Sequence, residues 1–475
     1  MHKIKHKFGL IVFLIFTIIA VTPMLWADEI SSSVYKNDTV QSASNVKPQL
    51  SVALTSINYS SSTAVDEKSQ GQAEMVIGLK KTGLIFSEVE GVIGSFSGTK
   101  TAYGTIPEAY IAFGTQGENF FAVGIKKQKL SFIDQYYHIG LYQSYLTNDF
   151  ISYRDQGFIG PQAQLHGDLF GVRAGFQKYF FPNQGPQVRE ENNSLVSGNR
   201  WAKRPPQSLE LFGRTNKINY EIREYRLTDI MSHEGETISI FAGPNADRPW
   251  VQMSYARKPL NDVPLSRETF AAVTTLIGHA RVSPVVTYDE VRSIDFDFDQ
   301  GLFKSTFSYL EDAPINTDPM PGETISSFQP LKIYGLYLSA QLDEVFSRRF
   351  EVSLAAAHVM GGEVNDKSAD GEESLVNYST SRTQFKDPIT LGISADIAIL
   401  KTLPLGAAVR WTYDRTFKGS LLSTEFNYAT VSHINFRAGF DILGLESEPT
   451  PDSTENFLSQ NQANDRLFAG VGYAF

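Results

Sequence analysis

The feature that most constrains the fold of this chain is a two-residue alternation of side-chain character, which recurs from about residue 50 to the end. Apolar or aromatic residues take every second position, and Arg, Asp, Glu, Ser and Thr take many of the positions between them. Successive side chains of a β-strand point to opposite faces of the sheet, so this pattern predicts strands with one apolar and one polar face. Polar or Gly- and Pro-containing turns separate the segments. The sequence therefore predicts an all-β protein.

The alternation is clearest between Leu422 and Ile442, where the even positions are apolar, aromatic or hydroxylic. We interpret this stretch as one strand, far longer than the five or six residues typical of globular proteins and suited to crossing a bilayer at a tilt. Clear alternation also marks the segments 294–298, 350–356, 389–399 and 405–413. Further candidate strands lie near 50–60, 72–81, 83–97, 104–115, 118–127, 168–180, 208–227, 236–257, 302–310, 332–342 and 374–384.

Composition favours a membrane barrel over a soluble sandwich. The 475 residues include 33 Phe, 21 Tyr and 36 Gly, although 20% of the chain is charged. Length alone would suggest two to four soluble domains, at roughly 100–200 residues each. A transmembrane barrel instead turns the apolar face of every strand to lipid and the polar face to a lumen. At roughly 25 residues per strand with its connection, the 448 residues after position 27 predict about 18 strands, within a range of about 16–20, in one antiparallel barrel over residues 48–475.

The first 27 residues read as a secretory signal peptide. Lys3, Lys5 and Lys7 precede an apolar run from Phe8 to Val21, and Ala27 is a small residue at the expected cleavage point. An uncleaved anchor helix is the alternative, although the run is short for a membrane span. Residues 28–47 are rich in Ser and Asn and predict a flexible polar lead-in. The absence of Cys suits an oxidising envelope compartment, and the net charge of −10 argues against general nucleic-acid binding.

The lengths of the connections predict the orientation of the strands. If the last strand ends on the periplasmic side, the segments 443–463, 361–373 and 311–331 become long external loops, as such barrels usually have. The same count makes 416–420 a short periplasmic turn. It also places the connection 400–403 outside, although this connection is short and external loops are usually long. The strand assignments near 400–403 are therefore provisional.

The C-terminal residues resemble the sorting signal that the outer-membrane assembly machinery of Gram-negative bacteria reads. Gly470, Tyr473 and the terminal Phe475 match its pattern, and Phe468 departs from it because a polar residue is usual there. An aromatic end also suits a strand that closes at the membrane–water interface. The alternative is an ordinary strand of a soluble protein.

Residues 104–186 narrow the family. Glu108–Tyr110 ("EAY") lies on one predicted strand and Val123–Lys126 ("VG.K") on the next, followed by Arg154–Gly157 ("RD.G") and a strand ending near Asn183–Gly185. This order resembles the phosphate-selective porin O/P family and related substrate-specific porins, although the last motif is longer here by one residue. The resemblance covers about a fifth of the chain. It implies an outer-membrane porin, and homotrimers are common in that family.

The resemblance also implies that the loop after the second of these strands folds inward. In this chain it would be residues 129–156, with Asp134 to Asp149 narrowing the pore. An ordinary external loop is the alternative.

Inward-pointing charges decide what a pore selects. The alternation places two groups of charged side chains on the polar faces of the predicted strands. The candidate pore-lining residues are the cations Lys126, Arg173, Arg223, Arg410 and Arg437 and the carboxylates Asp295, Asp297 and Asp414. The resemblance would make the cations a path for anions such as phosphate. A lumen of mixed, opposed charges is the alternative, and the sequence does not decide between them.

The sequence predicts no enzyme, cofactor or metal site. The eight His residues are scattered, with no metal-ligand pair at helical spacing. Gly94–Gly98 resembles a nucleophile elbow, but Phe96 occupies the position of the nucleophile. The acidic stretch from Asp366 begins like a calcium loop and has Asn377 where a bidentate Glu is required.

The sequence therefore predicts a Gram-negative outer-membrane porin, with membrane lipid, the assembly machinery and a small solute as its partners. Passive or facilitated diffusion of small polar or charged solutes is the predicted function. Two alternatives stay open: a channel without a plug that takes up a larger ligand such as an iron chelate (a siderophore), and a structural or adhesive barrel.

Overall fold

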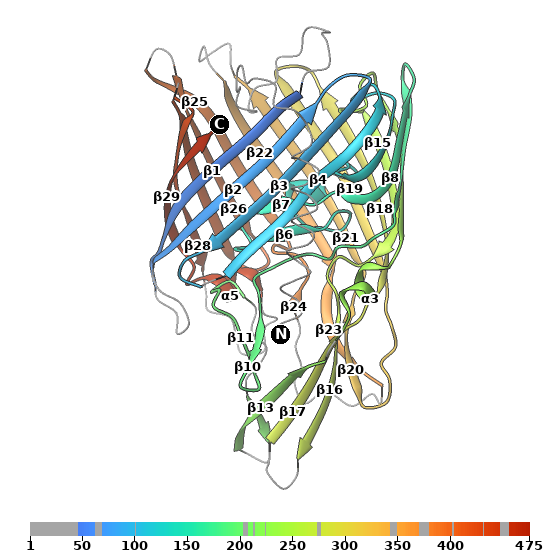
Figure 1. Ribbon diagram of the computed structural model, residues 1–475, viewed down its shortest axis with the longest axis vertical. Helices are drawn as coiled ribbons and strands as arrows, with labels where there is room; N and C mark the ends of the chain where they lie inside the picture. Colours follow the sequence, from blue (N-terminus) through green and yellow to red (C-terminus); the bar gives the residue numbers. More distant parts are fainter. Residues whose placement is uncertain are drawn as a thin grey trace, which may run out of the picture. The chain divides into compact units, whose positions relative to one another are not determined.

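The computed structural model forms one closed antiparallel barrel of 18 strands, with a smaller sheet built from its connections (Figure 1). The residues described by the structure are 46–61, 69–99, 101–202, 208–211, 214–223, 225–272, 277–342, 349–369, 380–400, 403–430, 432–446 and 456–475. The predicted signal peptide and nearly all of the predicted lead-in lie outside these residues.

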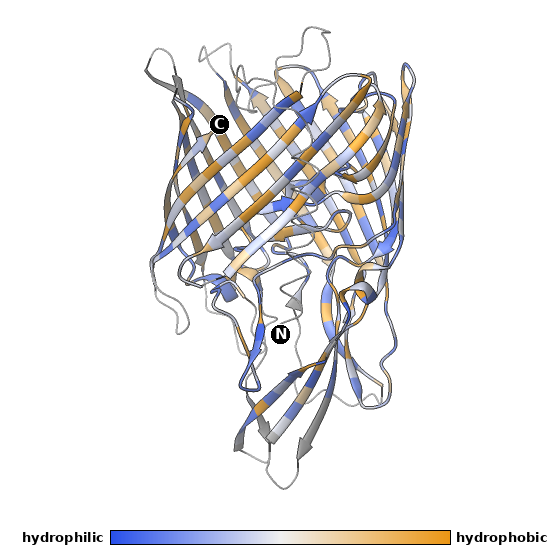
Figure 2. Cartoon of the chain, viewed as in Figure 1, coloured by the Kyte–Doolittle hydropathy of each residue, from blue (hydrophilic) through white to orange (hydrophobic). Residues whose placement is uncertain are grey.

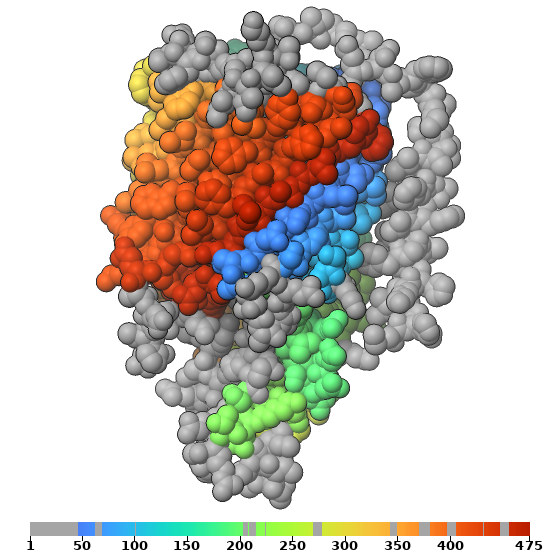
Figure 3. Space-filling view, turned by 90° about the vertical axis from the view of Figure 1, so that its left-hand side faces the viewer, coloured from blue at the N-terminus to red at the C-terminus, as the bar shows by residue number. Residues whose placement is uncertain are grey.

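Each barrel strand pairs with the next one in the chain, and β1 pairs with β29 to close the ring. Figure 3 shows this closure, where the blue first strand lies against the red last strands. The barrel strands are β1 (Val46–Tyr59), β2 (Ser69–Lys81), β3 (Ile85–Phe96), β4 (Thr101–Gly114), β5 (Phe120–Lys126), β8 (Phe158–His166), β9 (Phe170–Gln177), β14 (Gly235–Ala242), β15 (Val251–Pro259), β18 (Tyr288–Asp299), β19 (Phe303–Ile315), β21 (Leu331–Gln341), β22 (Phe350–Gly361), β25 (Pro388–Leu400), β26 (Leu403–Asp414), β27 (Gly419–Ala429), β28 (Ile434–Leu445) and β29 (Arg466–Ala474). The predicted barrel and its strand number are confirmed.

The outer wall carries the apolar face of the alternation. Exposed apolar side chains follow one another around the ring, as with Ile111 on β4, Ile240 on β14 and Phe436 on β28, and orange bands mark them in Figure 2. A closed barrel satisfies the backbone hydrogen bonds of every strand, and this is what lets a sheet lie in lipid. Among the described residues, no helix is long and apolar enough to cross a membrane.

The two ends of the barrel differ in their connections. Val46 and Ala474 lie at one end, which we call the turn end, and every connection there is short. The opposite end, the loop end, carries the long connections 127–157, 178–234, 260–287, 316–330, 362–387 and 446–465. The segments 361–373, 311–331 and 443–463 emerge at the loop end, as the sequence predicted.

Four of the long connections contribute strands to a second sheet. Its order is β12-β13-β17-β16-β20-β23-β24, and β13 and β17 run parallel. Its strands are β12 (Ser208–Leu211), β13 (Arg214–Ile222), β16 (Leu265–Ala272), β17 (Ile277–Pro284), β20 (Glu323–Phe328), β23 (Glu363–Ser368) and β24 (Thr380–Ser381). Two-stranded pairs join β6 (Tyr145–Thr147) to β7 (Tyr153–Asp155) and β10 (Arg189–Glu191) to β11 (Ser194–Val196). The short helices are α2 (Phe132–Tyr136), α3 (Leu227–Met231) and α5 (Phe457–Asn461).

The prediction of one strand over 422–442 is wrong, because the chain turns between β27 and β28. Thr430 accepts a hydrogen bond at its carbonyl from the backbone N–H of His433, which has a positive φ of 61°. The turn joins strands in which Tyr428 pairs with Phe436, so the outward positions remain even on both sides. A turn that preserves this parity leaves no trace in a two-residue alternation.

This missed turn also explains the provisional orientation near 400–403. The connection 415–418 lies at the loop end, not on the predicted periplasmic side, and the short connection 401–402 lies at the turn end. The prediction missed the turn between β27 and β28 and counted 374–384 as an additional strand. These two errors cancelled, so the connections before 374 were still assigned to the correct end. The candidate 374–384 is no barrel strand: 374–379 lie outside the described residues, and Thr380–Ser381 belongs to the second sheet.

Three other segments differ from their predictions. The candidate 208–227 contributes β12 and β13 of the second sheet instead of crossing the barrel wall. The candidate 236–257 is two barrel strands, β14 and β15. The barrel strand Phe158–His166 has no counterpart among the predicted strands, because its inward positions carry Gln162 and Gln164 and its outward positions include Pro161 and Ala163.

Candidate solute pathway

The connection 127–157 between β5 and β8 folds into the barrel lumen. Gly335 on the inner face of β21 makes room for it, because a Cβ there would lie 2.3 Å from Cδ1 of Ile133 on α2. Ile133 and Leu141 are buried in the main apolar cluster, together with inward side chains of barrel strands. We call residues 127–157 the inward segment.

One side of the inward segment is held by hydrogen bonds to the inner faces of β14, β15 and β18. The phenolic hydroxyl of Tyr142 donates to the carbonyl of Ser254 and to Oγ of Ser293, both at 2.9 Å. The remaining bonds on this side run from Gln252 to the Lys129 carbonyl (2.8 Å), from Ser293 to the Leu130 carbonyl (3.0 Å), from the Phe132 N–H to Asp295 (3.1 Å) and from Thr237 to Gln128 (3.2 Å).

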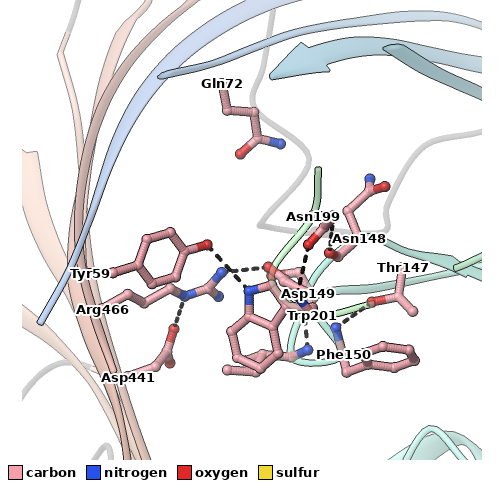
Figure 4. A network of polar contacts seen from close by, with 12 residues as sticks. Tyr59, Gln72, Thr147, Asn148, Asp149, Phe150, Asn199, Trp201, Asp441 and Arg466 are labelled. Atoms are coloured by element: carbon pink, nitrogen blue, oxygen red, sulfur yellow. Dashed lines mark hydrogen bonds and ion pairs between the residues drawn. The ribbon is translucent and has the colours of Figure 1, made fainter. Parts of the chain in front are cut away.

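The other side is held by an ionic contact to the wall formed by β28 and β29. Asp149 of the inward segment and Asp441 of β28 both contact the guanidinium of Arg466 on β29, at 2.6 Å each (Figure 4). Trp201 lies beside this group and donates its indole N–H to the hydroxyl of Tyr59 at 3.2 Å. Burial of the Asp149 carboxyl opposes its ionisation, but Arg466 and hydrogen bonds from nearby N–H groups keep the pKa of Asp149 below its usual value. The carboxylate is therefore charged in its contact with Arg466.

A tight turn inside the segment depends on Asp134. Its buried carboxylate accepts hydrogen bonds from the backbone N–H groups of Leu141 (2.9 Å) and Tyr142 (3.1 Å). Burial raises the pKa of Asp134 to about 6, although these two bonds favour the charged form. The turn therefore has a carboxylate that titrates close to neutral pH.

Two chambers lie along the inward segment. The outer chamber, of about 780 Å³, is lined by the inward segment and by the connections of the loop end, including Trp201, Phe328 and Phe457. The inner chamber, of about 450 Å³, is lined by the inward segment and the inner faces of β26, β27, β28 and β29. Both chambers are lined by the same six side chains, which we call the shared ring: Tyr137, His138, Phe150, Tyr153, Gln384 and Phe385.

Five of the six side chains of the shared ring are aromatic, and none of the six is charged at neutral pH. The rings of His138 and Tyr153 stack with centroids 4.7 Å apart and an angle of 8° between their planes. Burial, with a contribution from Arg410, lowers the pKa of His138 to about 4, so its imidazole is neutral at pH 7. Gln384 donates its amide to the Phe150 carbonyl at 2.6 Å and to the Tyr153 hydroxyl. These bonds connect the inward segment to the connection before β25.

The inner chamber carries most of its charge in pairs. Arg437 contacts Glu425 at 2.8 Å, and Arg466 contacts Asp441 as described above. Arg410 differs from both. It donates to the Tyr136 carbonyl at 3.2 Å and lies 4.7 Å from the centre of the Tyr136 ring, with no carboxylate contact among the described residues.

The predicted pore-lining residues separate into two groups. Arg410 and Arg437 both line the inner chamber. Five others line neither chamber, although the alternation assigns them to the polar face. These are Lys126, over the Tyr110 ring at 4.2 Å; Arg173, bound to Gln164 and the Lys129 carbonyl; Asp295, bound to Ser308 and the Phe132 N–H; Asp297, bound to Thr306; and Asp414, bound to four backbone N–H groups around the β26–β27 turn and before β25.

The prediction that Arg223 faces the lumen is wrong. It follows β13 of the second sheet, is half exposed and contacts Glu268 at 3.1 Å. The reason is the topology of 208–227, which alternates like a barrel strand but pairs with other connections of the loop end. Alternation reports two different faces and does not report which sheet the strand joins.

Sequence reasoning missed Arg466 and the shared ring. Arg466 takes the inward parity of β29, one position before the predicted terminal strand began at Leu467. Extending the alternation by one residue would have found it. The shared ring lies in connections without alternation, so the sequence held no periodic signal for its residues.

The predicted assembly signal lies at the seam of the barrel. Gly470 faces Thr55 so closely that a Cβ would lie 2.7 Å from its hydroxyl, and the N–H of Phe475 donates to the Leu50 carbonyl at 2.7 Å. Tyr473 and Phe475 are exposed on the outer wall. Phe468, the departure from the signal, points inward with the guanidinium groups of Arg437 and Arg466 5.2 Å and 5.8 Å from its ring. Recognition of these residues by assembly machinery stays a prediction.

Comparison with known proteins finds likeness only at the level of structure. No family model and no curated protein matches the sequence. Among solved structures, three porins are similar: OccK5 (OpdH) of Pseudomonas aeruginosa, OccK2 (OpdF) of the same organism in complex with glucuronate, and a BenF-like porin of Pseudomonas fluorescens Pf-5. Their identities are 10%, 10% and 11%, and their TM-scores 0.44, 0.46 and 0.46. Each likeness covers 91% of this chain and 98% of the other.

None of the three bears the name of a phosphate-selective porin. The resemblance to the phosphate-selective porin O/P family and related substrate-specific porins therefore stays a prediction. At this level of identity, a likeness of fold does not extend to a solute or to a binding residue. Among the described residues, no group of three or more His, Cys, Asp or Glu could hold a metal ion.

Proposed function

We propose that this chain is an outer-membrane porin through which small polar or charged solutes diffuse passively. The observation that carries the proposal is the pair of chambers that share one ring inside a closed barrel. A solute entering at the loop end meets the outer chamber, passes the shared ring and reaches the inner chamber along β26–β29. The inward segment acts as the constriction of this path.

Several features support the outer membrane as the location. The outer wall is apolar around the barrel, the connections are short at one end and long at the other, and Tyr473 and Phe475 are exposed on the outer wall. This asymmetry is typical of outer-membrane barrels, whose long connections face the outside of the cell. The signal peptide over 1–27, recognition of Gly470, Tyr473 and Phe475 by the assembly machinery, and a homotrimer complete the proposal.

Arg410 supplies the inner chamber with a positive charge that no carboxylate contacts among the described residues. Arg437 is paired with Glu425, whereas Arg466 contacts two carboxylates, Asp441 and Asp149, so the three groups together carry no net charge and the ion preference depends on Arg410. One such cation can bias the passage of ions, since a pore selects by the charged groups that line it. A ladder of cations specific for phosphate is not part of this proposal.

Conductance in a planar bilayer tests the channel, and the reversal potential under a salt gradient tests its preference. Arg410→Gln should move the reversal potential toward cations, while Arg223→Gln, which removes a cation outside the barrel wall, should leave it unchanged. A purified barrel that folds but does not conduct would exclude a porin and favour the structural or adhesive reading. Equal reversal potentials for Arg410→Gln and the unaltered chain would exclude Arg410 as the selective group.

A further inference from the structure

The outer wall of the barrel carries six charged side chains beside the loop end. They occupy outward positions on five neighbouring strands: Glu236 on β14, Arg257 on β15, Glu290 and Arg292 on β18, Glu311 on β19 and Lys332 on β21. We call these six residues the charged belt. Neighbours across the strands have opposite signs. Arg257 lies opposite Glu236 and Glu290, and Glu311 lies opposite Arg292 and Lys332.

The charged belt lies where the wall leaves the hydrocarbon of the membrane. Toward the loop end, the outward positions of β19 run from Phe307 through Tyr309 to Glu311. On β21 the outward residue before Lys332 is Tyr334, whose ring centre lies 5.1 Å from that of Tyr309. Tyr is enriched at membrane–water interfaces, and charges on the lipid face of a barrel are costly at the midplane but tolerated near the interfaces. The belt is therefore at the depth of the lipid headgroups.

The charges are confined to one end and one arc of the wall. At the turn end of the same strands, the outward positions include Phe298 and Phe303. Beside the loop end at the seam, the outward positions in register are Ala469, Ser56 and Gly71. Because the sheet closes there without charged side chains, pairing of the strands does not require the belt. This confinement indicates a contact with a partner outside the barrel.

The three cations of the belt keep most of their N–H donors available. Arg292, 58% exposed, contacts Glu290 at 2.9 Å through one nitrogen. The ammonium of Lys332 lies 3.8 Å from Glu311, which is too far for a hydrogen bond. Arg257 is exposed and contacts no carboxylate among the described residues. A guanidinium has five N–H donors, and its geometry matches pairs of phosphate oxygens. The belt can therefore bind phosphate groups without breaking the barrel.

We propose that the charged belt binds the phosphate groups of lipopolysaccharide, the anionic lipid of the outer leaflet of Gram-negative outer membranes. Arg257, Arg292 and Lys332 contact the phosphates of its lipid A headgroup, and the acyl chains lie on the apolar wall beyond Tyr309 and Tyr334. Clusters of Lys and Arg at the membrane surface are the usual means of binding anionic headgroups. This inference rests on the proposed outer-membrane location and does not depend on the solute that the channel carries.

Native mass spectrometry of the full chain with diphosphorylated lipid A tests the proposal, with EDTA present to remove divalent cations. The variant Arg257→Gln/Arg292→Gln/Lys332→Gln should bind lipid A about tenfold or more weakly, since each cation at the surface contributes to binding of an anionic lipid. The unaltered chain should bind lipid A without phosphates as weakly. Inorganic phosphate at the concentration of the lipid should not compete, because it lacks the acyl chains that lie on the wall.

Two variants separate phosphate binding from a change of overall charge or of the fold. Arg189, Arg223 and Arg281 are exposed on the connections of the loop end and each contacts a carboxylate. Their triple replacement by Gln changes the charge equally and should leave the binding of lipid A unchanged. The variant Glu236→Gln/Glu290→Gln/Glu311→Gln removes repulsion of phosphate and should bind lipid A more tightly. Heat-dependent gel mobility checks that each barrel has folded.

Three results would overturn the proposal: equal losses of lipid A binding in the two cation variants, weaker binding in the carboxylate variant, or unchanged binding in the belt cation variant. If that last variant instead changed the oligomeric state in detergent, the belt would be a contact between copies of this chain. Any of these results in a barrel that conducts normally would leave the channel intact. Binding that depends on the belt in a barrel that does not conduct would support the lipid contact and contradict the porin.

Discussion

Two of the barrel walls that the inward segment contacts hold it in chemically different ways. Toward β14, β15 and β18 it makes many hydrogen bonds without an opposite-charge pair, and its apolar side chains pack into the main cluster. Toward β28 and β29 its wall contact is ionic, through Asp149 and Arg466. The inner chamber lies on the ionic side, beneath Tyr153 and the other residues of the shared ring.

This difference indicates which side of the segment can yield to a solute. On the hydrogen-bonded side many packed contacts hold the inward segment, so the loss of one contact leaves the segment in place. On the ionic side a single guanidinium holds two carboxylates, and removal of one member leaves buried charge without a partner. The contact between the inward segment and the wall of β28 and β29 therefore depends on one residue, Arg466, while ion pairs of Arg154 with Glu74 and Glu90 hold the end of the segment against β2 and β3.

The largest effect should follow from Arg466→Gln, which breaks the ionic side. Asp149 and Asp441 would then repel each other without a cation between them, at a cost of about 3–5 kcal/mol for a buried pair broken in this way. We expect the inward segment to leave the wall and the single-channel conductance to rise severalfold. Planar-bilayer recordings measure this, with heat-dependent gel mobility as the check that the barrel has folded.

Two neighbouring variants separate loosening of the segment from damage to the wall. Asp149→Asn removes the contact of the segment and keeps Arg466 paired with Asp441, so it should also raise the conductance. Asp441→Asn keeps the contact between Asp149 and Arg466, so its conductance should stay near that of the unaltered chain. An unchanged conductance in Asp149→Asn would show that the ionic contact does not hold the segment.

A smaller effect should follow from Tyr142→Phe on the hydrogen-bonded side. The variant loses the bonds to Ser254 and Ser293 but keeps the packing of the ring, so the free energy of local opening should fall by about 1–3 kcal/mol. Hydrogen exchange over 139–145 should become faster while the conductance stays the same. Tyr255→Phe, which removes a hydroxyl from the outer face of the same wall, is the matched control. If Tyr142→Phe conducted as well as Arg466→Gln, the two sides would not differ in how firmly they hold the inward segment.

The smallest effect concerns pH and the turn at Asp134. The pKa of this carboxyl is about 6 in the folded segment, against about 3.9 in an unfolded chain. Between these values the folded segment binds more protons, so its ordering becomes more favourable as the pH falls from 7 toward 4. From pH 7 to pH 5 the gain is at most about 1.4 kcal/mol per pKa unit crossed.

Hydrogen exchange at 141–142, corrected for the intrinsic rates, measures this gain. Asp134→Asn should remove most of it. Burial also raises the pKa of the nearby Asp155. The variant Asp155→Asn leaves Asp134 in place, so it should keep most of the pH dependence at 141–142. His138 stays neutral over this range because its pKa is about 4. A pH dependence that survives in Asp134→Asn would assign it to another group.

Alternation in the sequence predicted the faces of the strands more reliably than their ends. Between β14 and β15 the outward positions change from even, as at Ile240, to odd, as at Met253. A change of parity inside 236–257 is therefore a visible mark of a turn. Between β27 and β28, Phe426 and Phe436 are both outward and both even, so nothing in the pattern marks the turn. Alternation marks a strand boundary where a connection shifts the parity or interrupts the pattern, and the connection 430–433 does neither.

The sequence by itself determined the barrel wall: a closed antiparallel sheet of about 18 strands, apolar outside, with Arg410 and Arg437 facing inward. It did so because a strand repeats every two residues, and lipid and water impose opposite demands on its two faces. The tertiary structure alone decided the shared ring, the pairing of Arg466 with Asp149 and the exclusion of Arg223 from the lumen. These depend on contacts between segments far apart in the chain, which have no local period for a sequence pattern to record.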